Sequence, residues 1–352
     1  MKKKYLRSSE WFDNPKDPGL TALYLEKYLN YGLKRKDLQS GKPIIGIAQS
    51  GSDLAPCNRH FLELSKTIKD GIREAGGVPM EFPTHPIQET GKRPTAGLDR
   101  NLSYLSLVEV LYGYPIDGVI LTTGCDKTTP AALMAAATVN IPSIVLSGGP
   151  MLDGSYKGKK AGSGTIIWEA RRLYAKGEID YEEFMEMAEA SAPSIGHCNT
   201  MGTASSMNSI AEALGMSLTG GAIIPAPYKE REVISFKTGK RIVEMVHEEL
   251  TPSKIMIKKA FENAIYVASA IGASSNCPPH LTAIAKHMGI DFGIDNWDKL
   301  GRDIPLLVNC QPAGEHLMEG FFKAGGVPAI MQELLKNNKL HKKLITVTGK
   351  TV

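Results

Sequence analysis

Short apolar runs alternate with segments of helical periodicity through the first half of the chain. The apolar runs predict four strands, at residues 43–48, 78–82, 118–121 and 143–146, and the first of them reads as buried. Helices are predicted between them, one with Leu64, Ile68, Ile72 and Ala75 on a single face and two more at residues 101–112 and 130–138. This alternation predicts an α/β fold, with an open and mostly parallel sheet covered by helices on both faces.

The second half of the chain has mostly helical periodicity. Helices are predicted at residues 166–176, 181–190, 201–214, 229–249, 254–271 and 279–287, and one near the start of the chain at 21–31. A strand at 305–309 and helices at 316–323 and 329–336 continue the α/β pattern, and a strand and turn are expected at 344–352. We expect residues 1–40 to form an N-terminal arm and residues 41–352 to form one α/β domain.

Three of the five cysteines lie among polar residues. They occur in the segments Pro56-Cys57-Asn58-Arg59-His60, Gly124-Cys125-Asp126-Lys127-Thr128 and Gly196-His197-Cys198-Asn199-Thr200. The other two, Cys277 and Cys310, are expected to be small buried hydrophobes. The wide spacing of the first three does not fit a structural zinc site, whereas thiolates suit iron–sulfur chemistry. A binuclear cluster with three thiolates would leave one iron with an open position for a substrate hydroxyl.

Possible ligands for a harder metal occur near two of these strands. Glu89, Asp126 and Lys127 each follow a predicted strand, and in parallel sheets ligands collect at the carboxyl ends of strands. Glu89 lies in a polar loop, where both a solvated carboxylate and a metal ligand are plausible. A protonated lysine cannot bind a metal, which leaves Lys127 as a Schiff-base amine or as a lysine carbamylated by CO2. The neighbouring carboxylates favour the carbamylated form, which would bind Mg2+ through oxygen.

Composition narrows the class of protein. The chain has 352 residues, of which 42% are hydrophobic and 22% charged, as in ordinary globular proteins. The net charge of +4 is too small to indicate a nucleic-acid partner. No secretory signal or membrane-spanning stretch is apparent, and unpaired cysteines fit a reducing compartment. We therefore expect a cytoplasmic protein without nucleic-acid or membrane partners.

Taken together, the motifs resemble the dihydroxy-acid and sugar-acid dehydratase family. The resemblance extends from about residue 6 to the end, and its most specific parts are the three cysteine segments at 56–60, 124–130 and 196–205. Further similarity lies at 273–276 and 314–319, where Ala273-Ser274-Ser275 departs slightly from the family's usual Gly-Ser-Thr. The segment around Cys198 is similar to the pentonate (L-arabinonate and D-xylonate) dehydratases rather than to the branch of branched-chain amino-acid synthesis.

This resemblance implies a particular set of metals and ligands. Cys57, Cys125 and Cys198 would bind a [2Fe-2S] cluster, and Glu89, Asp126 and carbamylated Lys127 would bind Mg2+. The reaction would be loss of water from a 2,3-dihydroxy sugar acid, giving a 2-keto-3-deoxy acid. Family members continue into a β-barrel-like domain that supplies a serine base and another acidic Mg2+ ligand, and we expect this chain to lack that domain. A homo-oligomer, dimer or tetramer, is also expected by resemblance.

Other functions remain open on the sequence alone. A branched-chain dihydroxy-acid dehydratase would use the same metals on a different substrate. A Schiff-base lyase would use Lys127 without iron or Mg2+. A non-catalytic iron–sulfur subunit would act only with a partner that carries the missing domain, and the isolated chain would then be impaired in catalysis.

Overall fold

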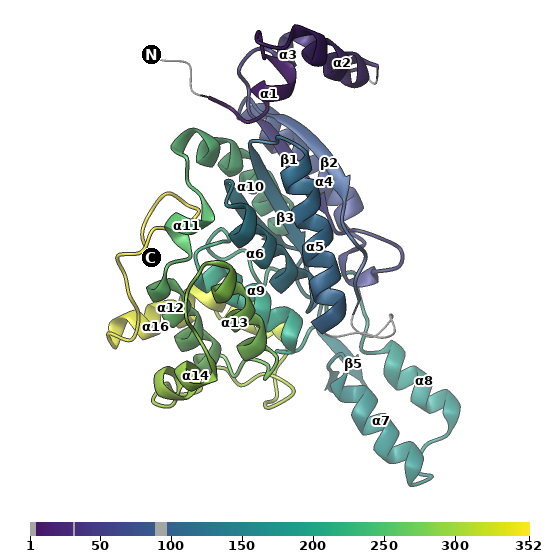
Figure 1. The fold of residues 1–352 in the computed structure, drawn as a ribbon. Helices are drawn as coiled ribbons and strands as arrows, with labels where there is room; N and C mark the ends of the chain where they lie inside the picture. Colours follow the sequence, from purple (N-terminus) through teal and green to yellow (C-terminus); the bar gives the residue numbers. More distant parts are fainter. Residues whose placement is uncertain (1–4, 31, 89–96) are drawn as a thin grey trace.

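A four-stranded parallel sheet forms the centre of the molecule. The computed structural model describes residues 5–30, 32–88 and 97–352, and Figure 1 shows their arrangement. The strands are β1 (Ile44–Gln49), β2 (Val78–Pro83), β3 (Gly118–Thr123) and β4 (Ser143–Ser147), and they pair in the order β2-β1-β3-β4. All three pairings are parallel. The prediction of a parallel α/β sheet is confirmed, because strands buried on both faces read as continuous apolar runs.

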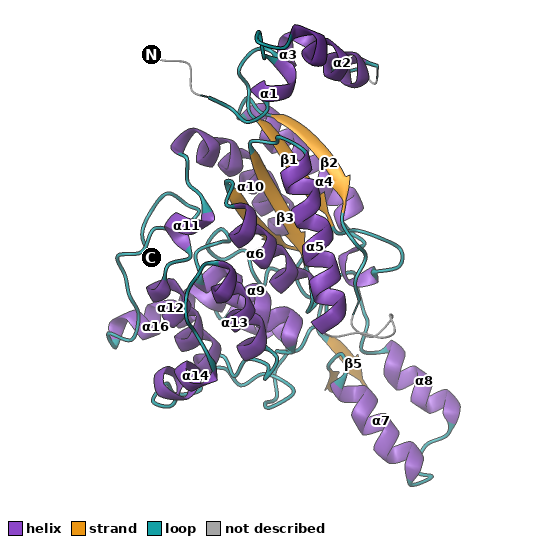
Figure 2. Ribbon diagram, viewed as in Figure 1, coloured by secondary structure: helices purple, strands orange, loops and turns teal. Residues whose placement is uncertain are grey.

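Helices cover the two faces of this sheet, as Figures 1 and 2 show. The helices α4 (Phe61–Glu74) and α10 (Lys229–Glu248) pack on one face, and α5 (Gly97–Gly113) and α6 (Thr128–Val139) lie on the other. The helix α6 is apolar around most of its circumference, and α9 (Thr203–Ala213) and α13 (Cys277–His287) cover its outer side. This second layer makes α6 one of the most deeply buried elements of the protein.

The remaining elements extend the fold on three sides. The helices α11 (Pro252–Ile255), α12 (Lys258–Ala270), α14 (Ile294–Gly301), α15 (Met318–Lys323) and α16 (Gly326–Lys336) lie with α9 and α13. A projecting lobe contains the hairpin β5 (Gly154–Tyr156) and β6 (Lys159–Ala161) with α7 (Thr165–Ala175) and α8 (Tyr181–Glu189). No helix in the described residues is both long and apolar enough to cross a bilayer.

The N-terminal segment forms α1 (Ser9–Phe12), α2 (Pro18–Leu29) and α3 (Arg35–Leu38). The buried carboxylate of Asp117 joins it to the sheet. This carboxylate accepts hydrogen bonds from the backbone N–H of Ser8 at 3.0 Å, its hydroxyl at 2.7 Å and the backbone N–H of Ile44 at 2.7 Å. Burial raises the pKa of Asp117, while these donors lower it.

Several predicted elements differ from the structure. Residues 305–309 form a loop instead of a strand, because they pair with no sheet strand and the Leu307 N–H bonds to the Ala270 carbonyl at the end of α12. The helix predicted at 254–271 is interrupted at Ile257, whose extended backbone begins α12. Residues 344–352 contain a single bridge, between Ile345 and Thr351, and no strand. The hairpin β5–β6 and the helix α14 were not predicted.

Two glycines allow α4 and α10 to cross at close range. A Cβ on Gly71 would lie 2.2 Å from the carbonyl oxygen of Phe236, and a Cβ on Gly239 would lie 2.3 Å from that of Ile68. These contacts are with backbone atoms, which cannot rotate away. Only glycine at both positions permits the observed crossing.

We therefore expect Gly71→Ala to lower the free energy of unfolding by about 1–3 kcal/mol, as overpacking of a tight contact does. Urea unfolding followed by circular dichroism measures the change. Gly113→Ala is the matched control, because a Cβ there meets nothing closer than the Glu109 side chain at 3.9 Å. Equal stability of the Gly71→Ala and Gly113→Ala proteins would contradict the proposed crossing constraint.

Candidate functional site

The three polar cysteines come from three separate loops. Cys57 lies in the short 3-10 helix η1 (Pro56–Asn58) between β1 and α4, and Cys125 lies between β3 and α6. Cys198 lies in the loop between α8 and α9. Since β1 and β3 are adjacent and parallel, the first two loops leave the same edge of the sheet.

The side chain of Asn58 joins the first two loops. Its Oδ1 accepts a hydrogen bond from the backbone N–H of Cys125 at 3.1 Å, and the Asn58 side chain is fully buried. The approach requires glycine at position 124, because a Cβ there would lie 2.2 Å from Asn58 Oδ1 and 3.4 Å from the Cys57 carbonyl oxygen. The Cys57 and Cys125 segments are thus in direct contact.

A second buried amide, Asn208 on α9, joins the loops of Cys125 and Cys198. Its Nδ2 donates to the Gly124 carbonyl at 3.3 Å and to His197 Nε2 at 3.2 Å. Its Oδ1 accepts from the hydroxyls of Thr123 at 3.1 Å and Thr129 at 2.9 Å. All the hydrogen-bonding groups of this amide are therefore used to connect β3, α6 and the segment that precedes Cys198.

His197 is fixed as a neutral ring next to Cys198. Because Nε2 accepts from Asn208, the proton lies on Nδ1, which donates to the Cys198 carbonyl at 3.0 Å. Complete burial lowers the pKa of His197 to about 3. The backbone of His197 also pairs with the turn after β4, through bonds to Gly149 and Met151.

Arg231 fills the space behind these loops. Its guanidinium is fully buried and donates to the carbonyl of Ser147 at 2.5 Å, to that of Gly221 at 2.9 Å and to that of Ile224. Burial, followed by the charge of Arg231, lowers the pKa of His60, which donates through Nε2 to the Gly148 carbonyl at 2.9 Å. This arrangement holds the ends of β4 and α10 together beneath the cysteine loops.

The thiols differ in exposure and surroundings. Cys125 is buried, whereas Cys57 and Cys198 are partly exposed. The hydroxyl of Ser163 donates to Cys198 Sγ at 3.3 Å. Burial raises the pKa of Cys198, and the charges of Cys125 and Asp126 raise it further, so these three groups lie within electrostatic reach of one another.

Asp126 and Lys127 form a buried ion pair directly after Cys125. The Lys127 Nζ lies 3.1 Å from Asp126 Oδ2, and the two residues are 4% and 7% exposed. Lys127 also caps the N-terminus of α6, where the helix dipole disfavours a positive charge and favours a negative one. Glu89, the other predicted Mg2+ ligand, lies outside the described residues.

The structure brings the three cysteine loops together. It does not bring a complete set of metal ligands together among the residues that it describes. Within residues 5–30, 32–88 and 97–352, no three His, Cys, Asp or Glu side chains stand close enough to hold one metal ion. The chemistry of the nearby groups nevertheless fits both metals: thiols on three joined loops suit iron, and the Asp126 carboxylate suits Mg2+. The predictions for Cys57, Cys125, Cys198, Asp126 and Lys127 as ligands remain predictions.

The other two cysteines are buried, as the sequence indicated. Burial raises the pKa of Cys277 to about 12 and that of Cys310 to about 11. Their thiols are therefore protonated at neutral pH, which is typical of cysteines in apolar packing.

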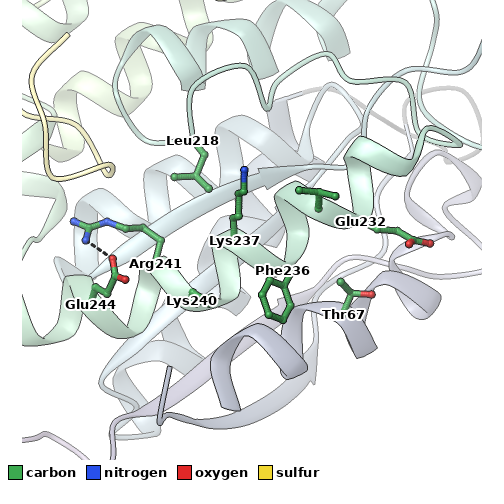
Figure 3. Close-up of a pocket in the computed structure, with 9 residues that line it drawn as sticks. Thr67, Leu218, Glu232, Phe236, Lys237, Lys240, Arg241 and Glu244 are labelled. Atoms are coloured by element: carbon green, nitrogen blue, oxygen red, sulfur yellow. Dashed lines mark hydrogen bonds and ion pairs between the residues drawn. The ribbon is translucent and has the colours of Figure 1, made fainter. Parts of the chain in front are cut away.

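A hollow of about 640 Å³ on the outer side of α4 and α10 is separate from these groups (Figure 3). Its described lining includes Lys240 and Arg241 but none of the three polar cysteines. Two of its three cations are paired, Lys240 with Glu74 at 2.7 Å and Arg241 with Glu244 at 2.8 Å. We assign this hollow to a solvated, ion-paired helix face.

Sequence reasoning missed the residues that assemble the site. Asn208 and Arg231 were not singled out, and Asn58 was noted only as a neighbour of Cys57. The available signal for Asn208 was an asparagine inside a predicted helix, where this residue has a low propensity. No local pattern distinguished Arg231 from the exposed charges around it on α10.

These observations define an α/β protein whose cysteine loops meet beside a buried aspartate–lysine pair at the carboxyl edge of its sheet. A family model described as the dihydroxy-acid/6-phosphogluconate dehydratase N-terminal region matches residues 42–352. The chain belongs to this family.

Named proteins of several bacteria are similar to this chain. The chain is 60% identical to the D-xylonate dehydratase of Caulobacter vibrioides, over 98% of this chain and 58% of the relative. It is 47% identical to the L-arabinonate dehydratase of Rhizobium leguminosarum bv. trifolii, over 100% of this chain and 61% of the relative. It is 38% identical to the dihydroxy-acid dehydratase of Acetivibrio thermocellus, over 90% of this chain and 58% of the relative. The chain thus spans about three-fifths of the length of these relatives.

The Asn208 bridge leads to a stability prediction. Asn208→Leu leaves two threonine hydroxyls, the Gly124 carbonyl and His197 Nε2 without this partner, so the free energy of unfolding falls by at least about 2 kcal/mol. Chemical denaturation measures it. Ser209→Ala on the same helix is the control and costs about 1 kcal/mol or less, because its hydroxyl bonds only to the Ser205 carbonyl. Similar losses in both variants would show that Asn208 does not connect the loops.

Proposed function

We propose that this chain carries the metal-binding part of a hydro-lyase that dehydrates a sugar acid of the pentonate class to a 2-keto-3-deoxy acid. The observation that carries the proposal is the contact among the three cysteine loops, made by Asn58 and Asn208, beside the buried Asp126–Lys127 pair. The substrate class follows from the relatives. Identity to the two named pentonate dehydratases is 60% and 47%, against 38% to a dihydroxy-acid dehydratase.

In this proposal the chain holds two metal groups. Cys57, Cys125 and Cys198 bind a [2Fe-2S] cluster, and Asp126, carbamylated Lys127 and Glu89 bind Mg2+. When bound, these groups supply Lewis acidity to the substrate's carboxylate and hydroxyl oxygens, where negative charge develops as water is lost.

The residues of the chain prepare the site for this chemistry. Burial of Cys125, Asp126 and Lys127 keeps bulk water away, which strengthens electrostatic interactions at the reacting atoms. The Ser163 hydroxyl lowers the pKa of Cys198 against the larger effect of burial, and so favours the thiolate that a metal requires. The Asn58 and Asn208 amides hold all three loops in a fixed relation before any substrate arrives, which is the usual requirement for a catalytic constellation.

The proton at C2 needs a base that this chain's motifs do not supply. Family resemblance assigns that role to a serine in the region of the relatives that this chain does not span. The branched-chain dihydroxy-acid reaction is the alternative with the same metals, and a Schiff-base lyase on Lys127 is the alternative without them. A non-catalytic iron–sulfur subunit remains the alternative from another class.

The cluster proposal predicts which cysteines hold iron. After anaerobic reconstitution, the chain should be brown, and Cys57→Ser, Cys125→Ser and Cys198→Ser should each lose most of the visible absorbance and bound iron. Cys277→Ser and Cys310→Ser are matched controls and should keep both, because these thiols are buried in apolar packing away from the cysteine loops. Loss of the spectrum in the two control variants alone would overturn the ligand assignment.

The activity proposal is tested on the reconstituted chain, alone and fused to the remaining region of the Caulobacter relative. We expect the fusion to form 2-keto-3-deoxy acids from D-xylonate or L-arabinonate faster than it dehydrates 2,3-dihydroxyisovalerate, and the chain alone to be weak or inactive. Lys127→Ala and Lys127→Arg should both abolish product in the fusion while iron content stays near normal, because neither side chain can become an oxygen ligand. Trapping of a reduced substrate imine on Lys127 would instead establish the Schiff-base alternative.

A further inference from the structure

A histidine on the helix α13 contacts an arginine on α5. The guanidinium Nη1 of Arg100, on α5, lies 3.1 Å from Nδ1 of His280, on α13. A guanidinium can only donate, so Nδ1 must accept. The proton of the neutral His280 ring is therefore on Nε2.

This Nε2–H donor is buried and has no hydrogen-bond partner among the described residues. His280 as a whole is only 4% exposed, so bulk water does not replace the missing partner. A buried donor without an acceptor is unfavourable, and native proteins contain few of them. The position therefore calls for an acceptor inside the protein.

Lys127 is the neighbouring group that can provide one. The helix α13 packs against α6, and Lys127 caps the N-terminus of α6. Burial lowers the pKa of His280 to about 3, and the positive charges of Arg100 and Lys127 lower it further. Burial and the charges of Arg100 and Lys127 thus keep the His280 ring neutral.

We propose that Arg100 and His280 position a carbamylated Lys127, with His280 Nε2–H donating to a carbamate oxygen. The inference rests on the proposed carbamylation of Lys127 and goes beyond it by naming the residues of this chain that stabilise the modification. Arg100 acts by fixing the ring form that leaves the proton on Nε2. Both are positioning residues.

Carbamylation would replace the Lys127 cation, which is paired with Asp126 at 3.1 Å, by an anion whose repulsion with Asp126 the proposed Mg2+ would offset. The lone pair of the neutral Nζ forms an N–C bond with CO2, one C=O bond becomes a C–O⁻, and the proton of the amine leaves to solvent. The product carries a negative charge at the N-terminus of α6, where the helix dipole stabilises anions. It also supplies the acceptor that Nε2 lacks, next to the fixed positive charge of Arg100.

The closed environment of the donor favours this partner over a substrate oxygen. Nε2 has essentially no solvent-accessible surface, so a diffusing ligand would first have to displace the atoms that cover it. A group attached to the chain's own lysine requires no such opening.

The test measures CO2 binding directly, apart from catalysis. The full chain is equilibrated with Mg2+ and increasing 13C-labelled CO2 and bicarbonate, and the carbamate carbon is followed by NMR, with Lys127→Arg as the blank. His280→Phe removes the donor and should weaken CO2 binding about tenfold or more, the loss expected for a hydrogen bond to a charged group. His280→Gln, which can place an amide N–H near the Nε2 position, should restore affinity to within about threefold of the parent chain.

His287→Phe is the matched control on the same helix. Its Nδ1 lies 3.0 Å from the Thr138 hydroxyl oxygen, and the substitution should leave CO2 affinity unchanged. Circular dichroism and urea midpoints check that each variant is folded, and recovery in His280→Gln separates loss of a donor from loss of packing.

The outcomes distinguish this inference from the proposed function. A carbamate in the parent chain that persists with equal affinity in folded His280→Phe overturns the inference alone. Absence of any carbamate in the parent chain overturns both the inference and the Mg2+ site as proposed. A carbamate that depends on His280 in a chain that binds no iron supports the inference and rejects the iron–sulfur part of the proposed function.

Discussion

The buried amide of Asn208 is the interaction on which the organisation of the candidate site depends. A single side chain accepts from two hydroxyls, on β3 and α6, and donates both to a carbonyl next to Cys125 and to the ring next to Cys198. In a low-dielectric interior it is costly to leave any of these hydrogen bonds unmade. The four hydrogen bonds of Asn208 therefore stabilise one another. These contacts within the chain thereby set how the Cys125 and Cys198 loops lie relative to each other.

Burial has a consistent effect on the charges around these loops. Burial lowers the pKa of His197 and of His60 and keeps both rings neutral. The charge of Arg231 lowers both pKa values further. The Arg231 charge is distributed over three backbone carbonyls instead of a carboxylate partner. A rigid polar layer therefore lies behind the thiols, and proton uptake by these histidines is disfavoured near neutral pH.

The buried Asp126–Lys127 pair is a different kind of feature, because it combines burial with an unfavourable position for a cation. An ammonium at the N-terminus of α6, with Arg100 nearby, is less favourable there than an anion would be. Buried ion pairs are weak contributors to stability in general, so their retention is better explained by chemistry than by folding. The proposed dehydratase site would give both residues a chemical role, with Lys127 in its modified form.

The sequence by itself determined the layered architecture. Continuous apolar runs specify strands buried on both faces, and the helical periods between them specify a parallel sheet, because both signals are local and repeat within a few residues. It also marked the three cysteine segments by their polar company. The failures at residues 305–309 and 344–352 have the same origin: composition favours a strand, but neither segment joins a sheet in the part of the chain that the structure describes.

Only the tertiary structure decided how the site is assembled. Asn208 meets Gly124 across 84 positions and Arg100 meets His280 across 180, and neither contact leaves a trace in local periodicity. Hydrophobic patterning reports which face of a helix is buried, but not which buried polar group it will meet. That choice depends on how α9 and α13 pack over α6, and it is made by the geometry of the folded core.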